Sequence, residues 1–309
     1  MRAARLPLLC FLPAALLLTA AAPAGAFVRT RSVTTNAPLF WSPGRASLEV
    51  VLPPDILGLS ATDMRGAAQD AVNTWSHPAV LCTSLALSLA PGFTQGRVVA
   101  YDGHNRIMMR TTAWCADPDA LTDCHDSSQV ALTTVFSRNH PGALDDGQIL
   151  EADIEVNGVD FEWGVIPDGP ISGRDYEYTY DLTSALTHET GHFIGLAHVC
   201  ELPGDPDRFD DHGLPSPACS ALTTNAAQGF LLDATMYPMM NPSDTSLRTL
   251  SKDDLEAVCS LYPELVPTVI GACAVSPGPS VGPRGGALGA MAACGVACVT
   301  LRRRRRRGS

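Results

Sequence analysis

The alternation of apolar and polar positions in the middle of the chain predicts three amphipathic helices. Residues 60–75 repeat apolar side chains at helical spacing behind Ser60, a favourable N-cap with an aspartate three residues later. Residues 180–195 form the second predicted helix, which begins beside polar residues and ends at a glycine. The third predicted helix runs from Ser251 to residue 262 and begins with the same capping pattern as the first.

Short apolar runs separated by turn residues predict the strands of a sheet. These runs are residues 47–52, 85–89, 97–101, 106–110, 130–137 and 148–156. In the last run Glu151, Asp153 and Glu155 alternate with apolar residues, so we expect a solvated face of carboxylates, with Ca²⁺ binding as the alternative. Together these elements predict an α+β domain with a twisted mixed sheet of four to five strands and three main helices.

Both ends of the chain have the composition of processing signals. Residues 1–26 combine two arginines, an apolar run and small residues at the end, as a cleaved signal peptide does. Residues 266–286 form a Pro/Gly-rich linker, and residues 287–309 contain an apolar segment followed by a run of arginines. This segment is shorter than the roughly 20 residues of a membrane-spanning helix, so we expect a sorting signal with transient membrane contact. With Gly271-Ala272-Cys273 ahead of it, the tail resembles myxobacterial C-terminal sorting segments, which implies retention at the cell surface.

The chain between these two ends is strongly acidic. Residues 27–270 contain 12 Lys and Arg against 32 Asp and Glu, which gives a formal charge of about −20. Nucleic acid is therefore not an expected partner, because binding to phosphates requires a cationic surface. An acidic body of this kind favours solubility and supplies many carboxylates.

Six cysteines lie in the same part of the chain, as expected for a protein exported to an oxidising compartment. Six cysteines allow 15 pairings, and the sequence does not choose among them. Short loops favour the pairs Cys115 with Cys124 and Cys200 with Cys219. These two pairs would leave Cys82 to pair with Cys259. The spacing C-x-x-C of a cysteine-bound zinc does not occur among them.

Residues 188–198 match the pattern H-E-x-x-H-x-x-G-x-x-H at every fixed position. Residues four apart share a helix face, so His188 and His192 can bind one cation, with Glu189 beside the open coordination position. Gly195 allows the backbone to turn, because glycine adopts a positive φ without strain, and His198 can then return as the third ligand. Three histidines and a water are typical of a catalytic zinc, for which Glu189 is the expected general base.

Two further strings extend this motif into a family resemblance. Residues 234–238, Ala-Thr-Met-Tyr-Pro, follow the third histidine after a long loop, and residues 250–263 read L-S-K-D-D-L-E-A-V-C-S-L-Y-P. With the histidine motif, these strings make residues 130–263 similar to the matrix-metalloproteinase (matrixin) branch of the metzincin zinc proteases. The metzincin pattern includes a methionine-containing turn after the histidines, and Met236 matches it.

The resemblance implies a zincin-like catalytic domain over residues 27–265, with a zinc cleft. It implies that Met236 packs beneath the three histidines and that Tyr237 and Pro238 wall the substrate pocket. It also implies that residues 130–137 are an edge strand that pairs with an extended peptide. The resemblance does not extend to the family's structural zinc, because the two strands concerned lack histidines at the family's positions.

We therefore expect a secreted endopeptidase, retained at the cell surface, that uses one Zn²⁺ to hydrolyse internal peptide bonds of extracellular proteins. Its expected partners are protein or peptide substrates. One alternative is a surface binding protein with a non-catalytic zinc site, and another is a zinc hydrolase of esters or glycans. Glu189 argues against the binding protein, because a structural site needs no base.

Overall fold

A mixed five-stranded sheet lies at the centre of the computed structural model, which describes residues 26–51, 59–77, 82–169, 176–226 and 228–264. The strands follow the order β3-β2-β4-β8-β7. Their bounds are β2 (Arg45–Val50), β3 (Ala86–Leu89), β4 (Arg106–Arg110), β7 (Ala131–Ser137) and β8 (Ile149–Asn157). The predicted α+β class is confirmed, and so is a mixed sheet of five strands.

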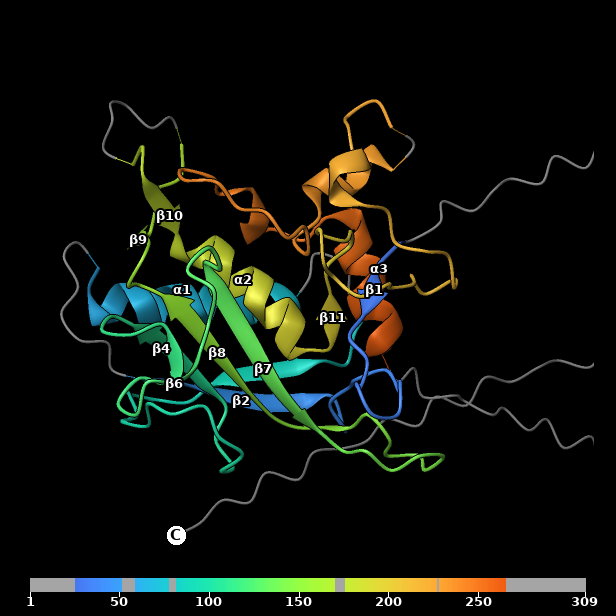
Figure 1. Cartoon of the computed structure of the whole chain (residues 1–309), viewed down its shortest axis with the longest axis horizontal. Coiled ribbons are helices and arrows are strands. Elements are labelled where there is room, and N and C mark those ends of the chain that lie inside the picture. Colours follow the sequence, from blue (N-terminus) through green and yellow to red (C-terminus); the bar gives the residue numbers. More distant parts are fainter. Residues whose placement is uncertain (1–25, 52–58, 78–81, 170–175, 227, 265–309) are drawn as a thin grey trace, which may run out of the picture. The chain divides into compact units, whose positions relative to one another are not determined.

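Strand β7 is an edge strand and differs from the other strands of this sheet in direction. The pairs β2–β3, β2–β4 and β4–β8 are parallel, whereas β7 is antiparallel to β8 and lies at the sheet edge (Figure 1). The predicted edge position of residues 130–137 is therefore confirmed. One side of the β7 backbone has no neighbouring strand in the described structure, which leaves its peptide groups open to another extended chain.

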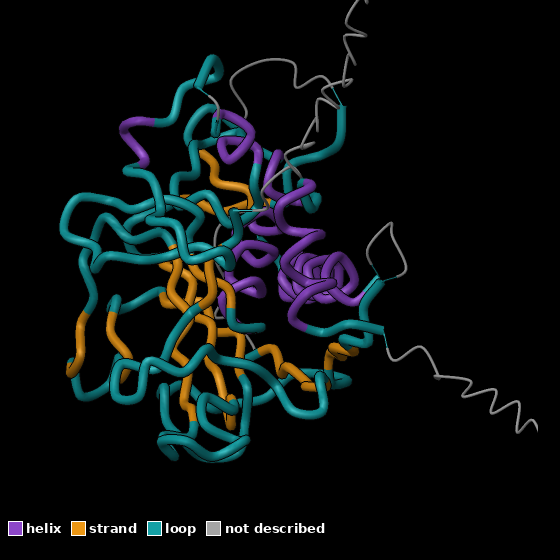
Figure 2. The backbone as a smooth tube through the Cα atoms, turned by 90° about the vertical axis from the view of Figure 1, so that its right-hand side faces the viewer, coloured by secondary structure: helices purple, strands orange, loops and turns teal. Residues whose placement is uncertain are grey.

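In the ranges that the structure describes, three α-helices accompany the sheet: α1 (Ala61–Ser76), α2 (Leu182–Phe193) and α3 (Lys252–Leu261). They agree with the three predicted helices to within two residues at each boundary. Ser60 and Ser251 form the predicted capping boxes, and Asp181 caps α2 by accepting a hydrogen bond from the Ser184 N–H. Helices α1 and α2 gather on one side of the strands (Figure 2), and α2 packs on β7 and β8.

Two buried tryptophans fix the position of α2. The indole N–H of Trp75, on α1, donates to the Thr187 carbonyl at 2.8 Å, and that of Trp41 donates to the Phe193 carbonyl at 2.8 Å. Trp75 is fully buried, and the Trp41 ring packs on Phe193 with 5.0 Å between ring centroids. Each tryptophan thus buries a large apolar surface while its polar N–H has a partner, which anchors the helix at two points.

Several short elements were not predicted from the sequence. They are the pair β1 (Val28–Arg29) and β11 (Leu196–Ala197), the pair β5 (Cys115–Asp117) and β6 (Thr122–Cys124), the pair β9 (Glu162–Gly164) and β10 (Thr179–Asp181), and the 3-10 helices η1 (Cys219–Ala221), η2 (Gly229–Asp233) and η3 (Ser246–Arg248). Strands of two or three residues and short 3-10 helices show no measurable periodicity, so the sequence pattern does not reveal them.

The predicted strand at residues 97–101 is wrong, because this segment is a loop that crosses the face of the sheet. Two of its backbone N–H groups have hydrogen-bond partners that form no strand ladder with it. The Val99 N–H donates to the Ala116 carbonyl at 3.0 Å, and the Ala100 N–H donates to an Asp153 carboxylate oxygen at 3.4 Å. A short Val-Val-Ala run matches the pattern of a strand. Its backbone N–H groups can instead bond to buried side-chain acceptors, and such bonds compete with the hydrogen bonds of a strand ladder.

The expected solvated face of carboxylates on β8 is also wrong, since Glu151, Asp153 and Glu155 are all fully buried. Each has protein partners. The Glu151 carboxylate accepts the backbone N–H groups of residues 102 and 103. The Asp153 carboxylate accepts the backbone N–H of Arg106 at 2.8 Å. The Glu155 carboxylate forms an ion pair with the Arg110 guanidinium at 2.6 Å. Burial raises the pKa of Asp153 to about 7. These carboxylates tie the loops around residues 97–125 to the sheet, and their oxygens are taken by protein donors, so they offer no ligand set for Ca²⁺.

Among the described residues there are three disulfides, and they are the three predicted pairs. Cys115–Cys124 closes the β5–β6 hairpin, and Cys200–Cys219 closes part of the long loop after α2. Cys82–Cys259 joins the segment before β3 to α3, across 177 residues of sequence. The two pairs favoured by short loops are therefore confirmed, and so is the pair that they leave.

The predicted linker and sorting tail lie outside the described residues, and so does the predicted signal peptide except for its last residue, Ala26. The chain divides after Val266 into two units, and the second unit has no described residue. In the described ranges, no helix has the length and apolar character needed to cross a membrane.

Candidate metal centre

Helix α2 and the turn after it place the three histidines of residues 188–198. The helix continues from Leu182 to Phe193, and the backbone then turns at Gly195, where φ is +98°. A Cβ at Gly195 would also lie 2.6 Å from the Leu39 carbonyl oxygen. Glycine is therefore required here for both its conformation and its size. The chain leaves the turn as β11, which pairs with β1 and leads directly to His198.

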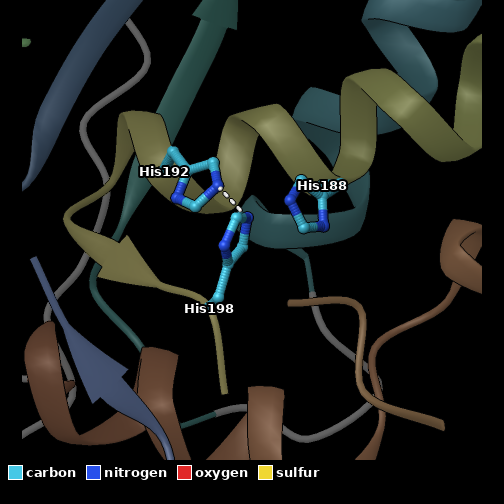
Figure 3. Close-up of side chains that lie close together, drawn as sticks. All are labelled: His188, His192 and His198. Atoms are coloured by element: carbon cyan, nitrogen blue, oxygen red, sulfur yellow. Dashed lines mark hydrogen bonds between the residues drawn. The ribbon is translucent and has the colours of Figure 1, made fainter. Parts of the chain in front are cut away.

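The turn brings the third imidazole back to the other two (Figure 3). The ring centroids of His188, His192 and His198 are 4.8 to 5.2 Å apart, and the Nε2 atoms of His192 and His198 are separated by 3.1 Å. Two nitrogens bound to one tetrahedral zinc at about 2.0 Å would lie about 3.3 Å apart. The three side chains thus form a group that can hold a metal ion.

Hydrogen bonds at the opposite ring nitrogens set the orientation of two of these histidines. Nδ1 of His188 lies 2.7 Å from the Thr235 carbonyl, and Nδ1 of His192 lies 2.8 Å from the Leu196 carbonyl. A carbonyl oxygen only accepts, so both Nδ1 atoms carry the proton and both Nε2 atoms keep a lone pair. This is the tautomer that a metal ligand needs, and the carbonyls hold the rings in place.

Burial also favours the neutral form of all three rings. Desolvation lowers the pKa of His188, lowers that of His192 to about 3, and lowers that of His198 well below its usual value. Neighbouring imidazoles add to the effect for His192 and His198 because a second positive charge would be repelled. Neutral imidazoles bind a divalent cation without first losing a proton at neutral pH.

Glu189 lies beside this group and is nearly fully buried, with 4% of its surface exposed. Burial raises the pKa of its carboxyl to about 7, and a hydrogen bond from the Thr133 hydroxyl opposes that rise. A pKa near neutrality suits a group that accepts and returns protons at physiological pH. Sequence reasoning identified Glu189 but missed Thr133, because nothing in a strand pattern indicates which side chain will face a helix.

The predicted methionine turn lies directly against α2. Met236 is 2% exposed and packs on Gly191, which lies on the helix between His188 and His192. The preceding residue, Thr235, supplies the carbonyl that orients His188. Asp254 on α3 accepts the backbone N–H groups of Thr235 and Met236 at 2.8 and 3.3 Å. The sequence indicated Asp254 only as a helix cap, whereas the structure shows that it also holds this turn.

The contact at Gly191 leaves no space for a side chain. A Cβ at this position would overlap Met236 Sδ and lie 3.0 Å from the Trp75 ring. We expect Gly191→Ala to lower the free energy of unfolding by about 1–3 kcal/mol, because overpacking displaces the methionine turn or the helix. Denaturant unfolding followed by circular dichroism measures this change.

Gly66→Ala on α1 is the matched control for Gly191→Ala. No atom lies within 4 Å of a Cβ at Gly66, so this substitution should stabilise the protein by about 0.5–1 kcal/mol through helix propensity alone. Equal stabilities of the two variants would contradict the packing described for Gly191 and Met236.

The histidines and Glu189 open onto a cleft with a volume of about 1220 Å³. Its walls include Thr133 and Val135 of β7, and Tyr237 and Pro238 directly after the methionine turn. The edge strand and the predicted pocket residues therefore lie on the same cleft as the metal-binding group. Leu202, Asp205 and Arg208 from the disulfide-closed loop after α2 line another part of it.

No protein-family model matches the chain, and no curated protein is significantly similar to it.

Proposed function

We propose that this chain is a zinc-dependent endopeptidase of the metzincin type, similar to the matrixin branch. The observation that carries this proposal is the convergence of three neutral imidazoles, with the Glu189 carboxylate beside them, on one open cleft. The protonated Nδ1 atoms of His188 and His192 leave their Nε2 atoms as ligands for Zn²⁺. When bound, the zinc ion would polarise the scissile carbonyl and acidify a water molecule.

The residues around the cleft have distinct tasks in this proposal. Glu189 removes a proton from the attacking water and delivers it to the leaving amine. The free side of β7 binds an extended peptide through backbone hydrogen bonds, as an added strand. Tyr237 and Pro238 form the wall of the pocket that receives a substrate side chain. An open-edged strand beside the reacting groups favours a peptide over an ester or a glycan as substrate.

The proposed location is outside the cell, on its surface. Three disulfides support export, because such bonds persist in oxidising compartments. The predicted signal peptide and sorting tail give the same expectation.

Metal analysis combined with peptide-library digestion tests the proposed activity. We expect one zinc ion per purified chain, cleavage of internal peptide bonds, and loss of cleavage after treatment with a chelator. Added Zn²⁺ should restore cleavage after the chelator is removed. A zinc-loaded, folded protein that cleaves no library peptide would contradict the proposal and favour a binding protein with a non-catalytic zinc site.

A further inference from the structure

We propose that Thr133 is a positioning residue for the base of the reaction, with its hydroxyl holding the Glu189 carboxylate in the orientation that proton transfer requires. The inference rests on the proposed function, and it assigns a task to a side chain of the edge strand that the resemblance does not supply. Its basis is a hydrogen bond between β7 and α2. Thr133 Oγ1 lies 2.6 Å from Glu189 Oε2 and 3.1 Å from the Glu189 carbonyl oxygen.

The shorter of these two contacts is the one that fixes the carboxylate. A hydroxyl has a single proton, so Thr133 donates to one oxygen at a time. A separation of 2.6 Å is typical of a charge-assisted O–H···O⁻ bond, which is stronger than a bond to a neutral carbonyl. Thr133 therefore donates to Oε2, and the Glu189 carboxylate is bound through one defined oxygen.

This bond has no competitor at the Glu189 side chain. In the part of the chain that the structure describes, Thr133 is the side-chain carboxylate's one hydrogen-bond partner. Glu189 has three rotatable side-chain bonds, and burial alone does not select one rotamer among those that fit the cleft. The hydroxyl selects one rotamer by binding Oε2, and Oε1 has no hydrogen-bond partner among the described residues. Small errors in the placement of a reacting group cost large factors in rate.

The place of Thr133 on β7 links this task to substrate binding. Thr133 pairs with Ile154 of β8, so its backbone is fixed within the sheet while its side chain reaches α2. The strand proposed to receive the peptide backbone is thus the strand that orients the base. A peptide aligned on β7 is thereby placed in register with the carboxylate, without a mobile loop between the two.

Two substitutions at Thr133 test the proposal with purified, zinc-loaded protein and a peptide that the wild type cleaves. Thr133→Val keeps the shape of the side chain but removes the donor, and Thr133→Ser keeps the donor. We expect Thr133→Val to lower kcat on the order of tenfold with little change in KM, because the hydroxyl is bonded to the Glu189 carboxylate and the peptide is held through the β7 backbone, which the substitution keeps. Thr133→Ser should restore most of the wild-type kcat.

Thr187→Val is the matched control, because it removes a hydroxyl from α2 that donates to the Thr183 carbonyl within the helix. This variant should keep the wild-type kcat. Zinc content and thermal unfolding of every variant establish that each remains folded and loaded. Equal kcat for wild type and Thr133→Val, a change confined to KM, or failure of Thr133→Ser to restore kcat would each overturn the positioning role alone. A zinc-loaded wild type without peptidase activity would overturn the proposed function, and this inference with it.

Discussion

Replacement of Glu189 by glutamine should lower the rate of peptide hydrolysis by about 10²–10⁴-fold while zinc remains bound. Glutamine has nearly the shape of glutamate, and its amide oxygen can still accept the Thr133 hydroxyl. It cannot take a proton from water, so the step assigned to the base is lost. The three histidines that can hold a metal ion are unchanged in this variant. Steady-state kinetics on a library-derived peptide, together with zinc content by mass spectrometry, measures both quantities.

Glu256→Gln is the control for this substitution. Glu256 lies on α3, where it pairs with Lys252 at 3.5 Å on the surface, and it does not line the cleft. Hydrolysis by this variant should equal that of the wild type. If Glu189→Gln kept most of the activity, the base would have to be another group. If Glu189→Gln lost its zinc, its inactivity would say nothing about proton transfer. The proposal that Glu189 acts as the base and takes no part in holding the metal would then be wrong.

Loss of the Cys82–Cys259 disulfide should produce the largest change in stability. The bond closes a loop of 177 residues, and its removal releases chain entropy in the unfolded state worth about 5 kcal/mol. The double substitution Cys82→Ser with Cys259→Ser avoids an unpaired thiol. Backbone hydrogen bonds hold the same junction: the Ser84 N–H donates to the Tyr262 carbonyl, and the Glu264 N–H donates to the Cys82 carbonyl. We therefore expect the folded structure to survive with a much lower unfolding free energy.

The Cys115–Cys124 disulfide provides the comparison, because it closes a loop with a sequence separation of only 9. Its double serine variant should lose about 2.5 kcal/mol on the same entropic argument. Urea unfolding of both variants and the wild type gives the difference, which should be about 2–3 kcal/mol. A short-loop variant that is the less stable of the two would show that native contacts, rather than loop entropy, determine these effects.

The long regular elements could be predicted because their local pattern and their tertiary environment agree. Helix α1 buries the apolar stripe that its sequence repeats, and its predicted N-cap at Ser60 forms a capping box. The histidine motif is equally local, because helix geometry places His188 and His192 on one face and a glycine allows the turn before His198. Spacing along a helix is a property that a sequence displays directly.

The carboxylates of β8 show where such reasoning fails. Glu151, Asp153 and Glu155 have the alternation of a half-exposed strand, and the physical default for three carboxylates is water. Their burial depends on donors from residues 102–125, which lie in strand β4 and in the loops beside it and are distant from β8 in the sequence. Alternation with a period of two predicts which residues share one face of a strand. It does not predict which other segments of the chain cover that face.

The sequence by itself predicted the group of three histidines, the Glu189 carboxylate beside them, the two disulfide pairs with short loops, and the three helices, because each depends on spacing within a short segment. Tertiary structure decided which groups orient these residues. The Thr235 carbonyl on His188, Asp254 on the methionine turn and the Thr133 hydroxyl on Glu189 all join residues at least 18 positions apart. Such contacts arise only when separate elements pack together, since no local periodicity encodes the direction in which a buried donor will point.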